Sequence, residues 1–165
     1  MGYRDITAAQ ARAVFSYDPM TGIVSRRVKS TRGEAGPVSN DNGDGYSRVV
    51  FAGCRVYLHR LVWLLHYGEW PKGQIDHIDG NRLNNAITNL RDVPHEINAQ
   101  NEHRARKNNH STGVLGVSYV PSRKKYEANI TVSGQKVHLG RFDTVERAQI
   151  AYLTAKRAYH EGCTI

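Results

Sequence analysis

The chain has 165 residues and carries 23 lysines and arginines against 15 acidic residues, which gives a formal net charge of +8 at pH 7. This surplus of positive charge predicts a polyanionic partner, either nucleic acid or an acidic membrane surface. The chain contains no apolar stretch long enough to span a bilayer and no signal-peptide run, so we expect a cytoplasmic protein that does not insert into membranes.

The first segment, residues 1–55, predicts a helix, a turn and a strand that lead into the rest of the chain. Thr7 is a suitable N-cap for a short helix over residues 8–15. Residues 17–22 (Tyr-Asp-Pro-Met-Thr-Gly) predict a turn, and residues 22–28 then predict a strand.

A cluster of basic residues and a flexible loop come next. The cluster consists of Arg26, Arg27, Lys29 and Arg32. It can be a solvated face or a set of phosphate contacts, and the pattern favours neither interpretation. The loop, residues 30–45, is rich in Gly, Ser, Asn and Asp. Residues 46–52 and 55–58 flank a Gly-Cys pair, an arrangement that predicts a β-hairpin.

A strongly apolar segment, residues 59–67, predicts a helix that ends at Gly68, a usual helix stop. We expect this helix and the hairpin before it to form the local core for the residues that follow. His59, at the start of the helix, has two interpretations. It is a second-tier candidate for a functional site, or it is a histidine that is hydrogen-bonded at a helix start.

Two adjacent side chains, Asp76 and His77, lie in a short apolar run over residues 74–78 that predicts a strand. The next residues, 79–81 (Asp-Gly-Asn), tolerate left-handed backbone geometry and predict a turn at the end of this strand. A second short strand is expected over residues 89–93.

The helix expected after the second strand completes a candidate site. Pro94 suits its first turn, where the missing N–H costs nothing, and we expect residues 95–102 to be helical and to carry Asn98. A strand, loop, strand and helix in this order can bring Asp76, His77 and Asn98 to one point. Carboxylate and carboxamide oxygens are hard ligands that suit Mg²⁺, and an imidazole with a pKa of about 6.5 can take a proton from water at pH 7.

These residues resemble a motif of known enzymes. Asp76-His77, Asn89 and Asn98, with His-Arg-Leu-Val-Trp upstream at residues 59–63, resemble the HNH endonucleases, in particular the phage homing endonucleases of the ββα-metal type. The resemblance implies that His77 is the general base, that Asp76 and Asn98 bind the metal, and that Asn89 braces the loop between the strands. It also implies a phage-encoded protein that acts in the cytoplasm of the host cell.

The metal is expected to be a hard divalent ion. An Asn rather than a His at position 98 leaves one imidazole fewer on the metal, which favours Mg²⁺ (with Mn²⁺ or another divalent ion as a substitute) over Zn²⁺. Structural zinc is not expected, because the two cysteines, Cys54 and Cys163, form no Cys-x-x-Cys pair. A structural disulfide has little support for the same reason.

The asparagines of this region also have a purely structural interpretation, since such residues are common in turns and helix caps. They are Asn81, Asn84, Asn85, Asn89, Asn98 and Asn101. The spacing, the order of the elements and the basic remainder of the chain together favour a metal-dependent site.

A basic linker is expected over residues 105–112. Together with the end of the preceding helix it contributes Arg104, Arg106 and Lys107, and residues 101–165 carry 11 basic against 5 acidic side chains. Such a linker can lie along a DNA groove and contact phosphates without reading bases, or it can be a solvated tether.

The last segment, residues 113–165, predicts three short strands and one helix. The strands are expected over residues 115–120, 125–132 and 135–142, with turns between them. Thr144 is expected to cap a helix that runs to about residue 159, with alanines at helical spacing.

This segment resembles the AP2 DNA-binding domain, a three-stranded sheet backed by one helix. The resemblance rests on Gly-Val-Leu-Gly-Val at residues 113–117, Lys-Tyr-Glu-Ala-Asn-Ile at 125–130, His-Leu-Gly-Arg-Phe at 138–142 and Ala148 with Ala151-Tyr152. It implies that the exposed sheet face enters the major groove of double-stranded DNA. The candidate DNA-binding residues of this segment are Arg123, Lys124, Lys125, Tyr126, Asn129, Lys136, His138 and Arg141, and the matching positions also include Ser118 and Thr131.

The alternation of the middle strand constrains this face. It puts Tyr126, Ala128 and Ile130 on one side and Glu127, Asn129 and Thr131 on the other. Tyr126 can therefore share a face with Asn129 only if a bulge or a strand edge intervenes.

The sequence thus predicts an α+β protein in four parts. These are an N-terminal helix and hairpin region (1–55), a ββα-metal nuclease module (56–104), a basic linker (105–112) and an AP2-like module of three strands and one helix (113–165). The expected function is site-specific, homing-type hydrolysis of a DNA phosphodiester bond with one divalent metal ion and a histidine base.

Two other functions are weighed against this one. A non-enzymatic, sequence-specific DNA-binding regulator would use the AP2-like module alone, but a scaffold does not need Asp76, His77 and Asn98. Membrane-surface binding fits the charge, yet no helix combines an apolar face with a Lys/Arg-lined polar face. RNA as a substrate stays open, as do the DNA target, nicking versus double-strand cleavage, and the oligomeric state.

Overall fold

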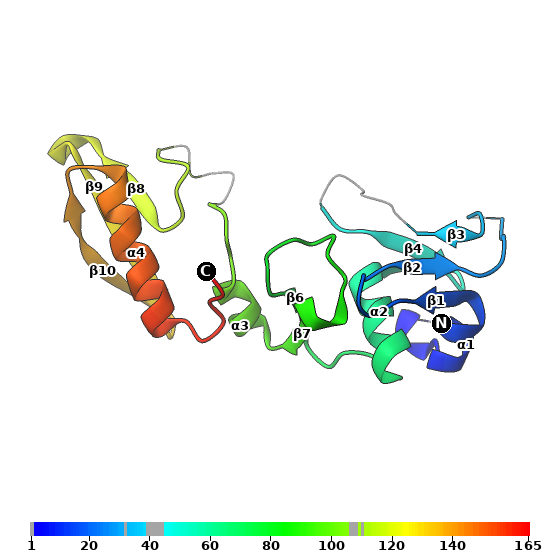
Figure 1. Cartoon of the computed structure of the whole chain (residues 1–165). Coiled ribbons are helices and arrows are strands. Elements are labelled where there is room, and N and C mark those ends of the chain that lie inside the picture. The colour runs from blue at the N-terminus through cyan, green and yellow to red at the C-terminus, as the bar shows by residue number, and fades with distance from the viewer. Residues whose placement is uncertain (1, 32, 39–44, 106–108, 110) are drawn as a thin grey trace. The chain divides into compact units, whose positions relative to one another are not determined.

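The computed structural model describes residues 2–31, 33–38, 45–105, 109 and 111–165. Three residues named above, Arg32, Arg106 and Lys107, therefore lie outside the described residues. The chain divides into two compact units, residues 1–95 and residues 96–165, which are considered separately (Figure 1). The division falls inside the segment that was expected to form the nuclease module.

The first unit begins with short helices and a small antiparallel sheet of three strands in the order β1-β2-β3. These elements are η1 (Tyr3–Asp5), α1 (Ala8–Val14), β1 (Phe15–Tyr17), β2 (Val24–Arg26) and β3 (Gly36–Pro37). The predicted cap is present, since the Gln10 amide donates to Thr7 Oγ1 at 3.2 Å. The helix ends one residue earlier than predicted, because Phe15 adopts extended backbone angles and begins β1. β2 covers only part of the strand that was predicted over residues 22–28. β3 lies within residues 30–45, the segment that was expected to be a loop.

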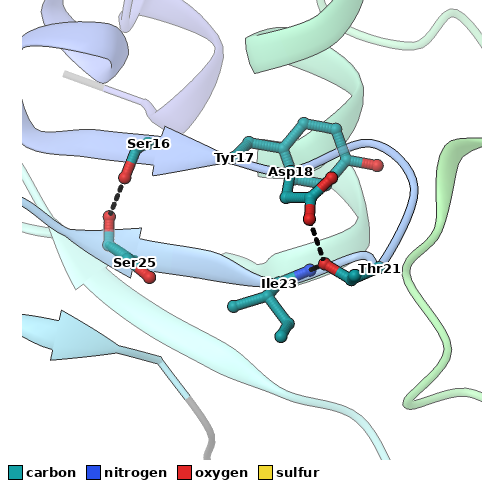
Figure 2. A pocket seen from close by; sticks show the side chains of 6 residues that line it. All are labelled: Ser16, Tyr17, Asp18, Thr21, Ile23 and Ser25. Atoms are coloured by element: carbon teal, nitrogen blue, oxygen red, sulfur yellow. Dashed lines mark hydrogen bonds between the residues drawn. The ribbon is translucent and has the colours of Figure 1, made fainter.

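The turn between β1 and β2 encloses a depression of about 270 Å³ (Figure 2). It is lined by Ser16, Tyr17, Asp18, Thr21, Ile23 and Ser25. The Asp18 carboxylate accepts hydrogen bonds from Thr21 Oγ1 at 2.7 Å and from the Met20 amide at 3.0 Å, and these bonds lower the pKa of Asp18. The turn itself therefore satisfies the carboxylate, and we assign the depression a structural role.

The predicted hairpin and apolar helix are both present. The hairpin consists of β4 (Arg48–Phe51) and β5 (Cys54–Tyr57), and α2 (Leu58–Tyr67) follows directly. The helix ends at Gly68, whose φ of +84° is the left-handed geometry that favours glycine at this position. The core of the first unit is built around α2, and its buried apolar side chains include Ala11, Phe15, Val24, Val56, Leu61, Val62 and Leu64.

A second hairpin and a short helix follow, within the segment that was expected to form the nuclease module. β6 (Gln74–His77) pairs with β7 (Leu90–Val93) in antiparallel register, and η2 (Ile87–Asn89) precedes β7. The next helix, α3 (His95–Gln100), begins directly after Pro94 as predicted. It ends at Gln100 and not at residue 102.

The second unit contains a sheet of three antiparallel strands in the order β10-β9-β8, with α4 (Val145–Tyr159) packed on it (Figure 1). β9 (Lys125–Val132) and β10 (Gln135–Phe142) have the predicted bounds, and η3 (Pro121–Arg123) forms the first turn. β8 (Val117–Val120) starts two residues later than predicted. The reason is Gly116, whose φ is +71° and whose hypothetical Cβ would lie 2.0 Å from the Tyr152 ring, so the chain bends there.

The two faces of this sheet differ as the alternation predicts. Ala128 and Ile130 are buried under α4, in a core that also contains Val117, Ala148, Tyr152 and Ala155. Tyr126 packs against this same core and is the register partner of Tyr119. The bulge of the sheet lies in β10, between His138 and Gly140, so it does not turn Tyr126 toward the other face. Grouping Tyr126 with Asn129 on a DNA-binding face was therefore wrong.

The end of the chain holds α3 within the second unit. The Gly162 amide donates to Gln100 Oε1 at 3.0 Å, and a Cβ on Gly162 would lie 2.2 Å from the Ile97 carbonyl oxygen. The Lys156 ammonium group is almost fully buried and donates to the carbonyl of Glu102. These contacts bind residues 100–102 in a non-helical path, and the helix therefore ends earlier than predicted.

Cys54 and Cys163 are not joined by a disulfide bond in the structure. Across the parts of the chain that the structure describes, we find no helix with the length and apolar character needed to cross a membrane.

Candidate active site

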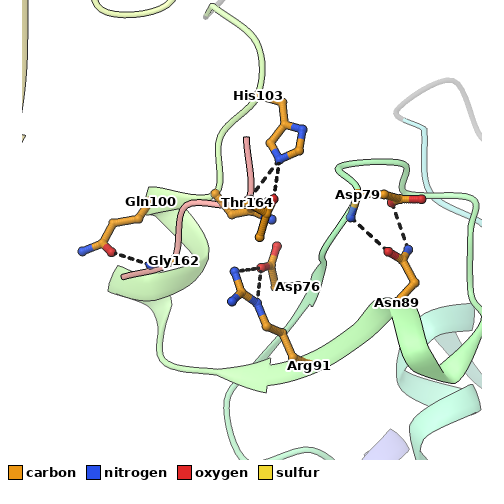
Figure 3. Close-up of polar contacts among 9 residues, drawn as sticks. Asp76, Asp79, Asn89, Arg91, Gln100, His103, Gly162 and Thr164 are labelled. Carbon is orange, nitrogen blue, oxygen red and sulfur yellow. Dashed lines mark hydrogen bonds and ion pairs between the residues drawn. The ribbon is translucent and has the colours of Figure 1, made fainter. Parts of the chain in front are cut away.

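Asp76 is held by a cross-strand ion pair. It lies on β6 directly opposite Arg91 on β7 and is only 5% exposed. Arg91 donates to Asp76 Oδ2 from Nε at 2.8 Å and from Nη2 at 2.7 Å (Figure 3). Both hydrogen bonds use the same carboxylate oxygen, and a carboxylate can bind Mg²⁺ through a single oxygen. The ion pair is therefore compatible with a metal-binding role for Asp76.

His77 is buried beside Asp76, and its neighbours define its tautomer. Its Nε2 lies 3.3 Å from Asn85 Oδ1, while Asn85 Nδ2 donates to the Leu83 carbonyl, also at 3.3 Å. The second hydrogen bond sets the orientation of the Asn85 amide, so an acceptor oxygen faces His77. An accepting oxygen at this distance matches the neutral tautomer of imidazole that carries its proton on Nε2.

The protonation state of His77 follows from its burial. Burial lowers its pKa, and Arg82 acts in the same direction, while the hydrogen bond to Asn85 and the charges of Asp79 and Asp76 oppose the shift. The net shift is downward, so the imidazole is neutral at pH 7. A neutral imidazole with an accepting Nδ1 is the form that a general base requires.

Asn89 ties together the loop between β6 and β7. Its side-chain amide donates to Asp79 Oδ1 at 2.9 Å, and its oxygen accepts from the Asp79 amide at 3.0 Å (Figure 3). The same side-chain amide also donates to the Asn84 carbonyl at 2.9 Å. Although burial raises the pKa of Asp79, hydrogen bonds from Asn84, Asn81 and Asn89 lower it overall. Asn89 is itself buried, and this geometry supports the bracing role that we propose for it.

The structure places His59 next to His77. The two ring centroids are 5.3 Å apart, and the Tyr57 ring stacks on His59 at the same centroid distance. Burial, helped by the neighbouring His77, Arg60 and Arg48, lowers the pKa of His59 to about 3. His59 is thus a neutral, buried member of the ring cluster around the candidate base.

The N-terminal turn supports the loop that carries Asn85, a role that sequence reasoning missed. Tyr17 Oη donates to the Asn85 carbonyl at 2.9 Å, and the Ile87 amide donates to the Pro19 carbonyl at 3.1 Å. Gly22 packs so closely that a Cβ there would lie 2.4 Å from the Ala86 nitrogen. The sequence Tyr-Asp-Pro-Met-Thr-Gly at residues 17–22 predicted a turn, but it contains no information about a contact with residue 85.

The metal donors predicted from the sequence are one carboxylate and one carboxamide oxygen, a set that suits Mg²⁺. Within the described ranges, no group of three or more His, Cys, Asp or Glu side chains is placed to hold a metal ion. A site that uses an asparagine oxygen and water would not form such a group. Asn98 lies on α3 in the second unit, whereas Asp76 and His77 lie in the first.

The outer face of the second unit's sheet carries four of the predicted DNA-binding residues, namely Asn129, Lys136, His138 and Arg141. The register places Asn129 opposite His138 and Glu127 opposite Arg141. His138 Nδ1 lies 3.3 Å from Asn129 Oδ1, and Arg141 Nε donates to Glu127 Oε1 at 2.6 Å. The side chain of Lys136 is exposed on the same face.

The other predicted basic residues of this unit lie around the sheet. Arg123 and Lys124 are exposed at the turn before β9, and Arg104 is exposed in the segment after α3. Lys125 forms an ion pair with Asp143. Basic side chains of this kind can contact DNA phosphates.

Comparisons with known proteins find a family match over the segment that contains these residues. The family described as HNH endonuclease matches residues 56–100, the segment that contains Asp76, His77, Asn89 and Asn98. The chain therefore carries an HNH endonuclease domain. HNH nucleases as a family depend on a divalent metal ion.

Two phage proteins are similar to the chain. Protein 3.8 of Escherichia phage T7 is 32% identical over 102 residues, which cover 61% of this chain and 83% of that protein. The chain belongs to the same family as protein 3.8. DNA endonuclease I-HmuI of Bacillus phage SP01 is 41% identical over 81 residues, which cover 46% of this chain and 42% of that enzyme, so the chain spans less than half of its length. No solved structure matches the chain.

Proposed function

We propose that the protein is a site-specific DNA endonuclease of homing type, which hydrolyses one phosphodiester bond with one divalent metal ion and His77 as general base. The observation that carries the proposal is the state of His77. It is buried beside Asp76, and its Nε2 lies 3.3 Å from the Asn85 oxygen. The similarity to a protein named as a DNA endonuclease supports DNA as the substrate.

In this proposal the remaining motif residues position the reacting groups. Asp76 and Asn98 would hold the metal, which we propose to be Mg²⁺, and Arg91 keeps the Asp76 carboxylate in place from β7. When bound, the metal ion supplies stabilisation of the charge that develops on the scissile phosphate and the leaving oxygen. His77 Nδ1 would accept the proton of the attacking water, and Asn89 keeps the loop beside it in shape.

The second unit would bind the double-stranded target. Its three-stranded sheet with one helix on the inner face is the arrangement expected for an AP2-like module, and the outer face presents Asn129, Lys136, His138 and Arg141. Side chains of these types can contact base edges and phosphates in the major groove. Phosphate contacts alone give dissociation constants of about 10⁻⁴–10⁻⁶ M at physiological salt, so a specific site needs base or shape readout in addition.

The test is incubation of the protein with plasmid and phage DNA in the presence of Mg²⁺ or EDTA, analysed on native and denaturing gels. We expect cleavage with Mg²⁺ and none with EDTA. The His77→Ala variant should lose about 10²–10⁴ in cleavage rate, the usual contribution of a general base, while it still binds DNA.

His66→Ala is the matched control, because His66 is exposed near the end of α2. Circular dichroism of both variants checks that they fold. Cleavage by His77→Ala at the wild-type rate would show that another group activates the water, and the absence of cleavage by the wild-type protein on every DNA would favour a binding function.

A further inference from the structure

The helix α3 carries Asn98, the last residue of the HNH motif, yet it is too short to be stable in isolation. It has 6 residues, and isolated helices shorter than about 12–15 residues are marginal in water. The structure describes every residue of α3, and none of them is buried or belongs to either apolar core. The position of Asn98 therefore depends on contacts that other segments make with α3.

Residues 160–165 make such contacts, and the closest one is at Gly162. The amide of this buried glycine donates to Gln100 Oε1 at 3.0 Å (Figure 3). A Cβ at Gly162 would lie 2.2 Å from the carbonyl oxygen of Ile97 and 3.0 Å from the Cβ of Gln100. The chain therefore packs against the last turn of α3 at a distance that only a residue without a side chain allows.

Thr164 holds the residue that follows α3. Its hydroxyl donates to Asn101 Oδ1 at 2.6 Å, and Asn101 is only 5% exposed. His103 Nε2 lies 3.0 Å from Thr164 Oγ1 (Figure 3). The backbone amide of Asn101 in turn donates to the carbonyl of Asn98 at 3.0 Å. Thr164 is therefore connected to the backbone of Asn98 through two consecutive hydrogen bonds.

The same segment is attached to the sheet and to α4 at its other contacts. His160 Nε2 donates to the Thr131 carbonyl of β9 at 2.8 Å. Arg157 Nε of α4 donates to the Ile165 carbonyl at 3.0 Å. Between these two points the Cys163 amide donates to the His160 carbonyl at 3.0 Å, which closes a turn. Residues 160–165 therefore connect α3 directly to the strand and the helix of the AP2-like part of the second unit.

We infer that residues 160–165 are a positioning segment, which fixes α3 to the sheet and α4 and thereby sets the position of Asn98 for metal binding. Gly162 and Thr164 are its positioning residues, since they act through α3 and Asn101. This inference rests on the proposed function, in which Asn98 binds the metal. It adds that the unit proposed to bind DNA also holds one metal-binding residue in place.

The first test measures amide hydrogen exchange of the full-length protein in EDTA, by mass spectrometry of a peptide that spans residues 96–101. Gly162→Ala should raise the exchange rate of this peptide about tenfold, because the added Cβ forces the segment away from the Ile97 carbonyl. Thr164→Val removes one hydrogen-bond donor and should raise the rate about fivefold. Thr164→Ser keeps the hydroxyl and should restore the exchange rate of the wild type.

Each variant has a matched control. Glu161 is the exposed residue directly before Gly162, and Thr154 is an exposed threonine on α4. We expect Glu161→Ala and Thr154→Val to leave the exchange of residues 96–101 unchanged. Circular dichroism of all variants checks that the sheet and α4 stay folded.

The second test asks whether the segment acts through Asn98. Mn²⁺ is titrated into the protein, and the electron paramagnetic resonance signal of free Mn²⁺ gives the affinity without any cleavage. Asn98→Ala and Gly162→Ala should each weaken Mn²⁺ binding by about tenfold, the lower end of the effect expected when a metal ligand loses its support. The double variant should bind Mn²⁺ no more weakly than Asn98→Ala, because a residue that acts only through Asn98 has no effect once that side chain is removed.

The outcomes distinguish this inference from the proposed function. Wild-type exchange of residues 96–101 in Gly162→Ala and Thr164→Val would overturn the positioning segment, whether or not the protein cleaves DNA. Faster exchange with unchanged Mn²⁺ affinity, or additive losses in the double variant, would overturn it as well. Faster exchange with a loss of Mn²⁺ affinity that depends on Asn98, in a protein that never cleaves DNA, would support the segment and contradict only the endonuclease. A wild-type protein that binds no Mn²⁺ would contradict both.

Discussion

The two units place their polar side chains in opposite ways. In the first unit, the candidate active-site residues Asp76, His77 and His59 are at most 8% exposed, and each contacts a partner from another segment. In the second unit, the polar residues of the sheet, such as Lys136 and His138, face solvent above a wholly apolar core.

Buried and exposed polar side chains have different properties, and these properties suit catalysis and binding respectively. Burial gives a side chain one orientation, a defined tautomer and a shifted pKa, which are properties that a reacting group requires. An exposed face keeps its side chains hydrated and adjustable, which suits contacts to a long polyanion. Lys156 and Asn101 are buried polar residues of the second unit. The Lys156 ammonium donates to the carbonyl of Glu102 after α3, so it has a structural role.

The largest effect on the buried residues of the first unit is expected from a substitution at Gly22, which lies outside the HNH motif. Ala at this position would place Cβ 2.4 Å from the Ala86 nitrogen and 2.5 Å from the Asn85 carbonyl carbon, at a φ of +76° that L residues rarely adopt. We expect Gly22→Ala to lower the free energy of unfolding by about 3–5 kcal/mol, because the loop beside His77 must shift in addition to the backbone strain. Cleavage should fall with it.

Gly53→Ala is the matched control for this experiment. Gly53 has a similar φ of +78°, but no atom lies within 4 Å of its hypothetical Cβ, so only the strain of about 1 kcal/mol remains. Urea unfolding followed by tryptophan fluorescence measures both, since both tryptophans of the chain, Trp63 and Trp70, lie in the first unit. Equal losses for the two variants would show that the contact with residues 85–86 does not support the loop.

The second expected effect is a pH dependence that belongs to His59. Its pKa is about 3 in the folded protein, whereas an unfolded histidine has a pKa of about 6.5. Between pH 3 and pH 6.5 the unfolded state therefore binds one more proton at this residue than the folded state does. The contribution of His59 to the free energy of unfolding keeps its full value above about pH 6.5. As the pH falls toward 3, it decreases by up to about 1.4 kcal/mol per pH unit.

Urea unfolding at a series of pH values measures this slope. Other groups of the first unit also lose stability in acid, among them His77 and Asp79, so the relevant quantity is the difference between wild type and His59→Gln. We expect a flatter pH profile for His59→Gln and an unchanged profile for His66→Gln, whose side chain is exposed. Parallel profiles for wild type and His59→Gln would mean that His59 is not buried in its neutral form.

The smallest effect is expected on the outer face of the second unit. Lys136→Gln should reduce the slope of log K against log salt for DNA by about 0.9. It should change the free energy of unfolding by no more than about 0.5 kcal/mol, since surface substitutions seldom do more. Arg147→Gln is the control, because Arg147 is exposed on α4, the helix on the inner face of the sheet. If both variants bind DNA equally, the outer face does not contact phosphate at Lys136.

Local patterns determined most of the elements. The alternation of residues 125–132 correctly predicts both the strand and its buried face, since Ala128 and Ile130 lie in the core. Gly68 ends α2, and Pro94 precedes α3, as their backbone preferences require. These are properties of a few neighbouring residues, so the sequence alone is enough to predict them.

Ends of elements depended on distant contacts. β8 starts only after Gly116, because the ring of Tyr152 from α4 occupies the space beside it. α3 ends at Gln100, where Gly162 and Lys156 from the end of the chain bind the residues that follow. No pattern within residues 95–102 contains this information.

The candidate site also has features that follow from local sequence patterns and features that depend on distant contacts. Local patterns were enough to predict that Asp76 and His77 are neighbours on one strand and that Asn89 follows at the spacing of the HNH motif. They did not predict the groups that surround these residues, which are Arg91 at the carboxylate, Asn85 at the imidazole and Tyr17 at the Asn85 carbonyl. The physical reason is that hydrogen bonding and burial act between segments far apart in the chain, and these interactions, more than the residue types themselves, set the pKa and the tautomer of a histidine.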